Sequence, residues 1–372
     1  MPLPDLSLDA DACRFDWDAL DRRFAWVRAM KDCPQDPVYH AEGNVWIHTR
    51  MVLDALMKLD AFAALSAAER WVVYAGALFH DVAKPDTTRE IDGRLSARGH
   101  STRGARRTRR ILWELGCDPM VREHVCRIVA AHQVPFFAAL EEGAARRVHR
   151  LSHKLRCDFL ALVTEADGRG RHCRDQDDLI ARVDLFRELC REEACLDQPR
   201  AFPDAHSRFL YFQTEGRNPA YAAHDDTRGE VTVLSGLPAS GKDHWCRQHA
   251  SDPVISLDDL RQELRIDPAD RKRQTEVVIE ARSRATELLR AGRPFVWNAT
   301  NLTRERRTRI VDLATRYRMR VRIVHLETSA ETQRARNRAR PRPVPEAIVD
   351  AMIDRWEVPT PDEAHAVEYL TT

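Results

Sequence analysis

Histidines and aspartates recur through the first half of the chain at the ends or faces of predicted helices. They are His48, the doublet His80-Asp81, His100, His132 and Asp167. Imidazole nitrogen combined with carboxylate oxygen suits Mn²⁺, Fe, Co²⁺, Ni²⁺ or Zn²⁺, and Mg²⁺ is a further candidate. A bound ion of this kind lowers the pKa of its water and supplies hydroxide near neutral pH. The set therefore predicts one or two divalent metals and attack on a phosphate ester, although one such histidine alone would more often be structural.

A glycine-rich turn in the last third of the chain indicates a second kind of phosphate chemistry. It reads Gly236-Leu-Pro-Ala-Ser240-Gly241-Lys242, after the β-rich run VTVLS and before a helical pattern. In that context successive backbone N–H groups curl around phosphate oxygens, and the helix N-terminus adds positive potential. Lys242 is expected to neutralise the β and γ phosphates. The turn predicts binding of ATP, or another NTP, with Mg²⁺.

The residue after Lys242 is Asp243, where a Ser or Thr hydroxyl normally binds Mg²⁺. A carboxylate can still reach the ion, directly or through water, which makes Asp243 a candidate metal-site residue. The alternative is an acidic residue that the helix dipole favours at an N-terminus. The sequence leaves both interpretations open.

Two acidic residues follow the next predicted strand, in the segment Ser256-Leu-Asp258-Asp259-Leu-Arg261. A carboxylate at the carboxyl end of such a strand lies beside the phosphate crevice of an open α/β sheet. There it can accept a proton from an attacking hydroxyl, and Asp258 is our candidate base. The two aspartates cannot both point into the crevice, so one of them is expected to cap the helix. Arg261 is expected to hold a substrate phosphate.

The arginine-rich segment RARNRARPR is predicted to present Arg336 and Arg340 on one helical face. Arg334 and Arg338 form a second pair with the same spacing. Arginines on a mobile helix beside a phosphate loop commonly clamp phosphates in the transition state. The alternative, a solvated helix face, is the more typical interpretation of an isolated arginine run such as residues 103–110.

The elements that must position these residues differ between the two halves of the chain. Residues 18–195 show apolar positions at helical spacing nearly throughout, which predicts an all-α domain. Residues 214–229 are polar and rich in Gly and Pro, as expected of a linker. Beyond them the runs EVTVLS, PVISL, PFVWNAT and RVRIVHLE alternate with helical segments. Strands separated by helices predict an α/β domain with a parallel sheet.

Composition sets limits on function and location. The 372 residues are long enough for two domains, and a net charge of +1 excludes general electrostatic adhesion to nucleic acid. Nine scattered cysteines without a CxxC pair are typical of free thiols in a reducing cytoplasm. The N-terminal segment lacks a signal-peptide pattern, and no apolar run approaches membrane-spanning length. We expect a soluble cytoplasmic protein with no membrane partner.

The histidine pattern resembles the HD phosphohydrolase superfamily, named for the doublet that here is His80-Asp81. YHAEGNVWIHTRMVLDAL, ALFHDVAKPDTT and GHSTRGA look similar to the HD domain of bacterial tRNA nucleotidyltransferases, over residues 39–167. The resemblance implies a first metal held by His48, His80, Asp81 and Asp167. His100 and His132 would hold a second metal or the substrate phosphate. Lys84 and Arg103 are expected to bind the ester phosphate, with simple surface charge as the alternative.

From about Glu230 onward the chain resembles the 5′-hydroxyl polynucleotide kinases typified by the phage end-repair enzyme. The segments that carry the resemblance are GLPASGK, SLDDLRQ, NATNLTRERR and RNRAR, in this order. The resemblance implies that Asp258 is the general base for a 5′-OH and that Arg261 contacts the adjacent nucleic-acid phosphate. Arg336 and Arg340 would bind the phosphates of the NTP donor.

Together the halves resemble the bacterial HD–polynucleotide kinase end-healing enzymes. A metal-dependent phosphatase domain at residues 1–225, including the linker, would remove 2′,3′-cyclic, 2′- or 3′-phosphates. A kinase domain at residues 226–372 would phosphorylate 5′-OH ends. RNA is the expected substrate, with DNA as a second candidate, and a polynucleotide ligase is the functional partner; the oligomeric state is left open. The alternatives are a nucleotide-metabolism enzyme that joins a small-molecule kinase to a nucleotide hydrolase, and a non-enzymatic nucleotide-binding regulator.

Overall fold

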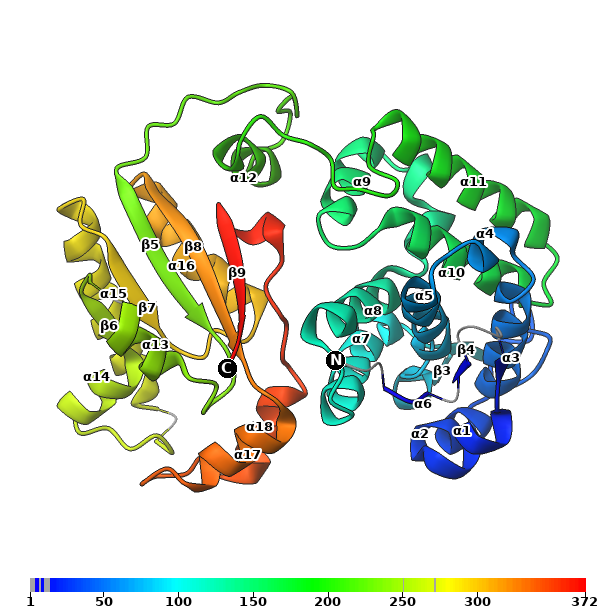
Figure 1. Ribbon diagram of the computed structural model, residues 1–372, viewed down its shortest axis with the longest axis horizontal. Coiled ribbons are helices and arrows are strands. Elements are labelled where there is room, and N and C mark those ends of the chain that lie inside the picture. Colours follow the sequence, from blue (N-terminus) through cyan, green and yellow to red (C-terminus); the bar gives the residue numbers. More distant parts are fainter. Residues whose placement is uncertain (1–3, 7, 10–13, 250, 271) are drawn as a thin grey trace. The chain divides into compact units, whose positions relative to one another are not determined.

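The computed structural model describes residues 4–6, 8–9, 14–249, 251–270 and 272–372. Clustering of contacts divides the chain into two compact units, Met1–Arg200 and Ala201–Thr372, which we call the helical unit and the α/β unit (Figure 1). The remaining N-terminal residues, on which the expected lack of a signal peptide partly depends, lie outside this description. Among the described helices, none is both long and apolar enough to cross a membrane.

The helical unit is built from eleven α-helices in the described part of the chain. They are α1 (Trp17–Arg23), α2 (Ala25–Lys31), α3 (Val45–Leu56), α4 (Asp60–Ala63), α5 (Ala67–Phe79), α6 (Lys84–Thr87), α7 (His100–Glu114), α8 (Pro119–Ala131), α9 (Ala144–Ser152), α10 (Cys157–Arg169) and α11 (Gln176–Glu192). Side-chain caps fix several starts: Asn44 accepts from the N–H of Ile47 at α3, and Ser66 forms a capping box with Glu69 at α5.

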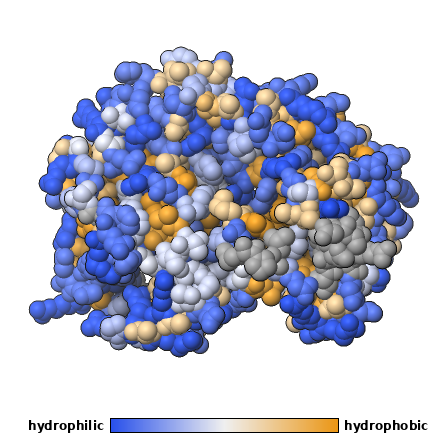
Figure 2. Space-filling model, in the orientation of Figure 1, coloured by the Kyte–Doolittle hydropathy of each residue, from blue (hydrophilic) through white to orange (hydrophobic). Residues whose placement is uncertain are grey.

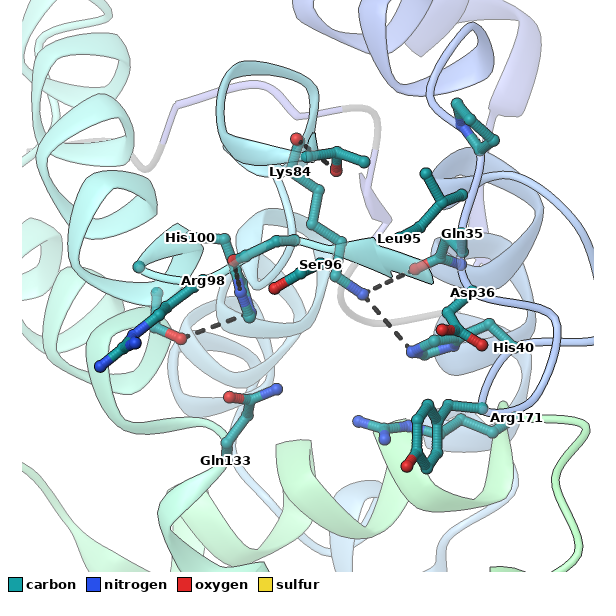
Figure 3. Close-up of a pocket in the computed structure, with 16 residues that line it drawn as sticks. Gln35, Asp36, His40, Lys84, Leu95, Ser96, Arg98, His100, Gln133 and Arg171 are labelled. Carbon is teal, nitrogen blue, oxygen red and sulfur yellow. Dashed lines mark hydrogen bonds between the residues drawn. The ribbon is translucent and has the colours of Figure 1, made fainter. Parts of the chain in front are cut away.

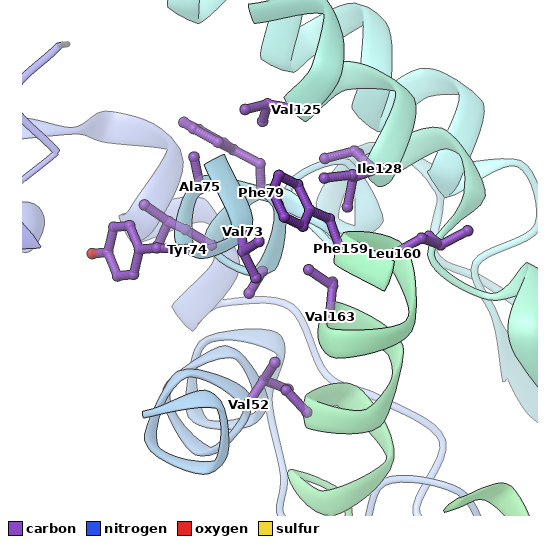
Figure 4. Close-up of a cluster of buried hydrophobic side chains, with 14 of the residues drawn as sticks. Val52, Val73, Tyr74, Ala75, Phe79, Val125, Ile128, Phe159, Leu160 and Val163 are labelled. Atoms are coloured by element: carbon purple, nitrogen blue, oxygen red, sulfur yellow. The ribbon is translucent and has the colours of Figure 1, made fainter. Parts of the chain in front are cut away.

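Helix α10 lies at the centre of this unit and is buried along almost its whole length. Its residues Phe159 and Val163 pack in one cluster with side chains from α3, α5 and α8 (Figure 4). Gly76 of α5 permits the close approach of α8, because a Cβ at that position would lie 2.8 Å from Ile128 Cγ2. This packing fixes the four helices that carry or precede most of the candidate metal ligands.

Besides the helices that confirm the expected helical domain, this unit contains short strands that the sequence did not predict. β3 (Arg89–Ile91) and β4 (Arg94–Ser96) form an antiparallel hairpin, and β1 (Leu8–Asp9) pairs with β2 (Arg14–Phe15). Asp92 and Gly93 both have positive φ, 52° and 74°, as a two-residue hairpin turn requires. Strands of two or three residues are too short to produce an alternating pattern, so these strands could not be predicted from the sequence.

The α/β unit contains a five-stranded sheet whose neighbouring strands are all parallel. Its strands are β5 (Gly229–Ser235), β6 (Val254–Ser256), β7 (Phe295–Asn298), β8 (Met319–Glu327) and β9 (Ala366–Thr371), in the spatial order β6-β7-β5-β8-β9. Its helices are α12 (Ala205–Gln213), α13 (Lys242–His249), α14 (Leu257–Glu263), α15 (Gln274–Arg290), α16 (Arg304–Arg316), α17 (Ala330–Arg338) and α18 (Glu346–Ile353). The predicted fold class is confirmed, and β9 is an additional strand.

Both faces of the sheet are buried. Val231 and Val233 of β5 belong to one apolar cluster, whereas Leu234 belongs to another that includes Trp245 of α13. Successive strand residues point to opposite faces, so this division shows that helices cover both sides. On the face drawn in Figure 2, hydrophilic residues form most of the outer surface of each unit. Because the strands are parallel, all their carboxyl ends share one edge, where the phosphate loop follows the central strand β5.

Candidate metal centre and phosphoryl-transfer site

The six histidines and aspartates predicted from the sequence converge in the helical unit. His48 lies within α3, and Asp167 lies within α10. His80 and His132 are the C-terminal cap residues of α5 and α8, and His100 is the first residue of α7. All six side chains are buried. Helix ends and faces far apart in sequence therefore place these six residues together.

The ligand atoms fall into two groups, and Asp81 contributes to both. In the first group, His48 Nε2 lies 3.1 Å from Asp167 Oδ1 and 3.3 Å from His80 Nε2. In the second, His100 Nε2 lies 3.3 Å from His132 Nε2 and 3.3 Å from Asp81 Oδ1. The other oxygen, Asp81 Oδ2, lies 3.2 Å from His80 Nε2. The arrangement offers two adjacent three-residue sites, with Asp81 between them.

The outer nitrogen of each imidazole faces an oxygen acceptor. The Nδ1 atoms of His80, His100 and His132 lie 2.7–2.8 Å from backbone carbonyls in the preceding turns. His48 Nδ1 lies 3.2 Å from Gly170 O and 2.8 Å from Glu42 Oε1. Each Nδ1 therefore carries the hydrogen of the neutral ring, and each Nε2 presents a lone pair.

Lone pairs facing one another at these distances need a cation between them. Asp81 Oδ1 is buried and accepts no hydrogen bond from any described residue. Buried polar atoms are rarely left without a partner, and a divalent ion would satisfy this oxygen and the Nε2 atoms together. The donor set thus fits one or two divalent metals, with His48, His80, Asp167, Asp81, His100 and His132 as the residues that would hold them.

The electrostatics favour the ligand forms of His100, His132 and Asp81. His48 differs, because burial lowers its pKa but hydrogen bonds with Asp167 and Glu42 outweigh burial and raise it. Burial lowers the pKa of His132 to about 3 and also lowers the pKa of His100, which keeps both rings neutral near pH 7. Burial alone would raise the pKa of Asp81, but its close contacts with the His80 ring and with the ammonium group of Lys84 hold it well below its ordinary value. A neutral imidazole and an ionised carboxylate are the forms that bind metal ions.

A pocket of about 410 Å³ opens beside the second group, with His100 in its wall (Figure 3). Its cationic side chains are Lys84, Arg98 and Arg171. Lys84 Nζ lies 2.7 Å from Asp81 Oδ2 and 2.6 Å from Gln35 Oε1. Arg171 donates from Nε to Asp167 Oδ1 at 2.9 Å and from Nη2 to Asp167 Oδ2 at 2.5 Å. These cations provide charged hydrogen-bond donors for phosphate oxygens next to the ligand group.

Of the two residues predicted to bind the ester phosphate, only one lies in the wall of the pocket. Lys84 is buried and lines the pocket, whereas Arg103 is exposed on α7 and is not among the described residues that line it. Arg109, in the arginine-rich run at residues 103–110, forms a buried ion pair with Glu123. Its Nη2 lies 2.7 Å from Glu123 Oε2. Arg98, just before α7, lines the pocket instead.

Sequence reasoning missed a carboxylate–histidine pair beside the metal ligands. Glu42 Oε1 lies 2.8 Å from both His40 Nδ1 and His48 Nδ1. The other oxygen, Glu42 Oε2, accepts a hydrogen bond of 3.0 Å from the N–H of His172. His40 Nε2 faces the pocket at 3.5 Å from Lys84 Nζ. The segment YHAEGN, shortly before His48, contains this histidine and this acid, and that spacing could have predicted the pair from the sequence.

The phosphate loop has the backbone that its glycines predict. Gly236 has φ 153°, and a Cβ there would lie 2.3 Å from Leu326 O, so no other residue fits. Lys242 is buried, and its Nζ donates to the carbonyls of Gly236 at 3.0 Å and Leu237 at 2.8 Å. Burial lowers the pKa of Lys242 to about 8. Ser240 is also buried in this loop.

The predicted carboxylates lie in α13 and α14, which follow the strands β5 and β6. Asp243 accepts a hydrogen bond of 2.8 Å from Asn298 Nδ2, at the end of β7. Asp258 forms an ion pair with Arg261 and keeps 65% of its side chain exposed. The expectation that Asp258 or Asp259 caps α14 is wrong: Ser256 is the cap, and its Oγ accepts from the N–H of Asp259. Serine is as effective a cap as aspartate, and Ser256 precedes Asp258 by two residues.

The arginines after β8 depart from the predicted geometry. α17 ends at Arg338, so Arg340 lies beyond the helix and does not share a helical face with Arg336. The Pro341 that follows prevents the helix from continuing. Arg336 donates to Thr372 Oγ1 at 2.9 Å, and Gln333 Nε2 donates to Pro238 O at 3.1 Å. Helix α17, which follows β8, is thus tied to the phosphate loop by Gln333 and to the end of the chain by Arg336.

Comparison with known proteins agrees with this division into two units. Residues 45–169 match the family described as HD domain, and residues 231–359 match the family described as AAA domain. The multifunctional CCA protein of Halorhodospira halophila (strain DSM 244 / SL1) is 31% identical over 189 residues, which are 46% of this chain and 41% of that protein. The chain therefore spans about two fifths of the length of this curated relative.

A solved structure of a provisionally named kinase from Chloroflexus aurantiacus shares 15% identity with a TM-score of 0.32. The match covers 40% of this chain and 87% of that one. The family matches and the two sites lead to one conclusion: the chain joins a helical HD domain to an α/β P-loop domain of the kinase-like kind.

Proposed function

We propose that this protein is a bifunctional end-healing enzyme for broken nucleic acid. The helical unit removes 2′,3′-cyclic, 2′- or 3′-phosphates, and the α/β unit transfers phosphate from ATP or another NTP to a 5′-OH. RNA is the primary substrate, and DNA is a second one. The products, a 3′-OH and a 5′-phosphate, are the ends that a polynucleotide ligase joins.

In the helical unit, the imidazole and carboxylate groups around Asp81 would hold the metal. A metal bound there would supply hydroxide near neutral pH and neutralise phosphate charge. The protein's own contribution is to bind the ester. Lys84 and Arg171 already contact the carboxylates of Asp81 and Asp167, so a phosphate bound by these two cations would lie next to the ligand group. Arg98 adds a third cation in the pocket wall.

In the α/β unit, Asp258 would accept the proton of the attacking 5′-OH, and Arg261 would hold the neighbouring phosphate. The two side chains are paired with each other, and Arg261 is also fixed by Gln274 Oε1 at 2.7 Å. Lys242 and the loop N–H groups would neutralise the donor phosphates, with Mg²⁺ near Asp243. Arg336 and Arg340, on the donor side, would add charge as the γ-phosphoryl group moves.

The observation that carries the proposal is that one chain holds two phosphate sites of complementary chemistry. One is a buried metal-ligand group that borders a cation-lined pocket, and the other is a phosphate loop with an aspartate–arginine pair at the strand edge. The alternative is a nucleotide-metabolism enzyme, favoured by the pocket volume of about 410 Å³, which suits a mononucleotide.

The test uses one RNA with a 5′-OH and a labelled 3′-phosphate, incubated with NTP and different divalent metals. We expect Lys242→Ala to lose the kinase activity and keep the phosphatase activity, and Asp81→Ala to do the reverse. If wild type and Asp81→Ala release phosphate equally, the helical unit is not the phosphatase. If excess mononucleotide, but not oligonucleotide, competes for the labelled γ-phosphate, the nucleotide-metabolism alternative replaces our proposal.

A further inference from the structure

Helix α16 carries several arginines, most of which form ion pairs with acidic residues. Arg304 Nη2 lies 2.8 Å from Asp362 Oδ2, and Arg307, which is buried, lies 2.7 Å from Glu363 Oε2. Arg309 pairs with Glu305 on the helix surface. In contrast, the guanidinium of Arg306 has no hydrogen-bond or ion-pair partner anywhere in the described ranges of the chain.

Arg355 is a second arginine without an ion-pair partner in the described part of the chain, and it lies near the end of α16 that carries Arg306. Its guanidinium also lacks a partner among the residues that the structure describes. Two residues later, Glu357 donates its N–H to Leu302 O at 2.8 Å and accepts from the N–H of Arg304 at 2.8 Å. These two bonds hold the segment that carries Arg355 against the start of α16, where Arg306 lies in the first turn.

The electrostatics agree with this placement. Burial lowers the pKa of Arg306, and the positive charges of Arg355, Arg309 and Arg261 lower it further, whereas the carboxylate of Glu305 raises it. Glu305 pairs with Arg309, and Asp258 pairs with Arg261. Four arginines with two paired carboxylates leave a net positive charge on this group, which gives it affinity for anions.

The cluster lies on the acceptor side of the phosphate loop. α16 follows β7, whose last residue Asn298 bonds to Asp243, and Arg261 belongs to α14, which follows the neighbouring strand β6. The donor-side helix α17 follows β8, on the other side of the central strand β5. Anions bound by Arg306 and Arg355 would thus belong to the molecule that receives the phosphoryl group.

We propose that Arg306 and Arg355 bind internal phosphates of a polynucleotide acceptor, beyond the phosphate next to its 5′-terminal nucleoside. This inference rests on the kinase part of the proposed function and narrows it. A nucleoside 3′-monophosphate carries one phosphate, which Arg261 would hold, and it has none to place on Arg306 and Arg355. Preference for longer acceptors is therefore built into the surface at the start of α16.

The experiment compares two acceptors, a ten-nucleotide 5′-OH RNA and a nucleoside 3′-monophosphate. For the double variant Arg306→Ala, Arg355→Ala, we expect the KM for the RNA to rise at least about tenfold, with the nucleoside 3′-monophosphate unaffected. The dependence of log KM on log salt for the RNA should also become shallower by about 1.4, because each contact to a single strand contributes about 0.7. Arg316→Ala, which removes an exposed arginine from the last turn of the same helix, is the matched control and should match the wild type.

The two acceptors distinguish a failure of the role of Arg306 and Arg355 from a failure of the kinase assignment. Equal loss with both acceptors, or no loss with either, would overturn the role of Arg306 and Arg355 while leaving the kinase assignment intact. A wild-type enzyme that phosphorylates the nucleoside 3′-monophosphate and no polynucleotide would overturn both. Phosphatase activity and the melting temperature report folding, and the variant Arg306→Lys, Arg355→Lys should restore most of the salt dependence because it keeps the charge.

Discussion

Asn298 donates a hydrogen bond of 2.8 Å from its side-chain amide to the carboxylate of Asp243. Asn298 ends β7, and Asp243 is the second residue of α13, directly after Lys242. The bond joins two segments at the carboxyl ends of the neighbouring strands β5 and β7, and it holds the Asp243 carboxylate beside the end of β7. This position is compatible with both interpretations of Asp243, as a Mg²⁺ ligand and as an acid at a helix N-terminus.

Replacement of Asp243 distinguishes the two roles. We expect Asp243→Ala to raise the Mg²⁺ concentration for half-maximal kinase activity about tenfold, since one charge-assisted contact is worth roughly 1.4 kcal/mol. Asp243→Ser should keep a Mg²⁺ dependence close to that of the wild type because it supplies a hydroxyl. Kinase rates measured across a Mg²⁺ titration check this. An unchanged titration with a melting temperature lowered by a few degrees would assign Asp243 to the helix dipole alone.

Glu42 is expected to position His48 rather than to bind the metal itself. Its carboxylate oxygen lies 2.8 Å from His48 Nδ1, which fixes the tautomer whose Nε2 faces the ligand group. Glu42→Gln should weaken metal affinity by about tenfold to a hundredfold, as is typical for such outer partners. Calorimetric titration with Mn²⁺ and the visible spectrum with Co²⁺ measure the effect. Glu188→Gln, on the exposed surface of α11, is the control, and equal affinities in both variants would refute the role.

The parts of the fold that repeat a pattern over many residues were predictable from the sequence. The helical spacing before residue 195 and the alternation of strands and helices after residue 229 gave the correct class for each half. The β3–β4 hairpin was not predictable because each strand has three residues. β9 was missed because Ala366–Thr371 is half-exposed at the sheet edge and mixes apolar with polar side chains.

Site residues were predictable where their chemistry is unusual for their position. The histidines stood out because so many recur at helix ends, and the structure brings them together. Arg171 was not identified, because a single arginine four residues after Asp167 looks like surface charge; only the fold buries it in the pocket wall. The prediction that Arg336 and Arg340 share a helical face was wrong because Pro341 ends the helix before Arg340.

Lys84 is predicted to bind the phosphate ester. It lines the pocket and donates to Asp81 Oδ2 at 2.7 Å, so its removal takes a charged donor from the space next to the ligands. Lys84→Met should lower kcat/KM for a 3′-phosphate RNA by about tenfold to a hundredfold, because hydrogen bonds to charged groups contribute roughly 1.5–3 kcal/mol. Metal content, measured by mass spectrometry, should stay at the wild-type level. Lys58→Met, an exposed lysine in the same unit, is the control; loss of metal instead of catalysis would show that Lys84 only supports Asp81.

His365 predicts a pH dependence for the stability of the α/β unit. Its Nδ1 accepts a hydrogen bond of 3.1 Å from the N–H of Val321, and its Nε2 lies 3.2 Å from His206 Nδ1. Burial first, and the charge of Arg320 second, lower the pKa of His365 to about 3. The unfolded chain protonates this residue near pH 6.5, so between these values the unfolded state binds one more proton. Stability is therefore complete above about pH 6.5 and falls by about 1.4 kcal/mol per pH unit as the pH drops toward 3.

The variant His365→Asn isolates this contribution, because its side-chain oxygen can accept from Val321 but does not titrate. Hydrogen exchange of peptides that cover β8 and β9, corrected for the intrinsic rate, should show protection that declines below pH 6 in the wild type and less steeply in the variant. His224→Asn, an exposed histidine in the same unit, should follow the wild type. If His365→Asn loses protection with the same pH slope as the wild type, the acid sensitivity comes from other groups, and His365 contributes packing alone.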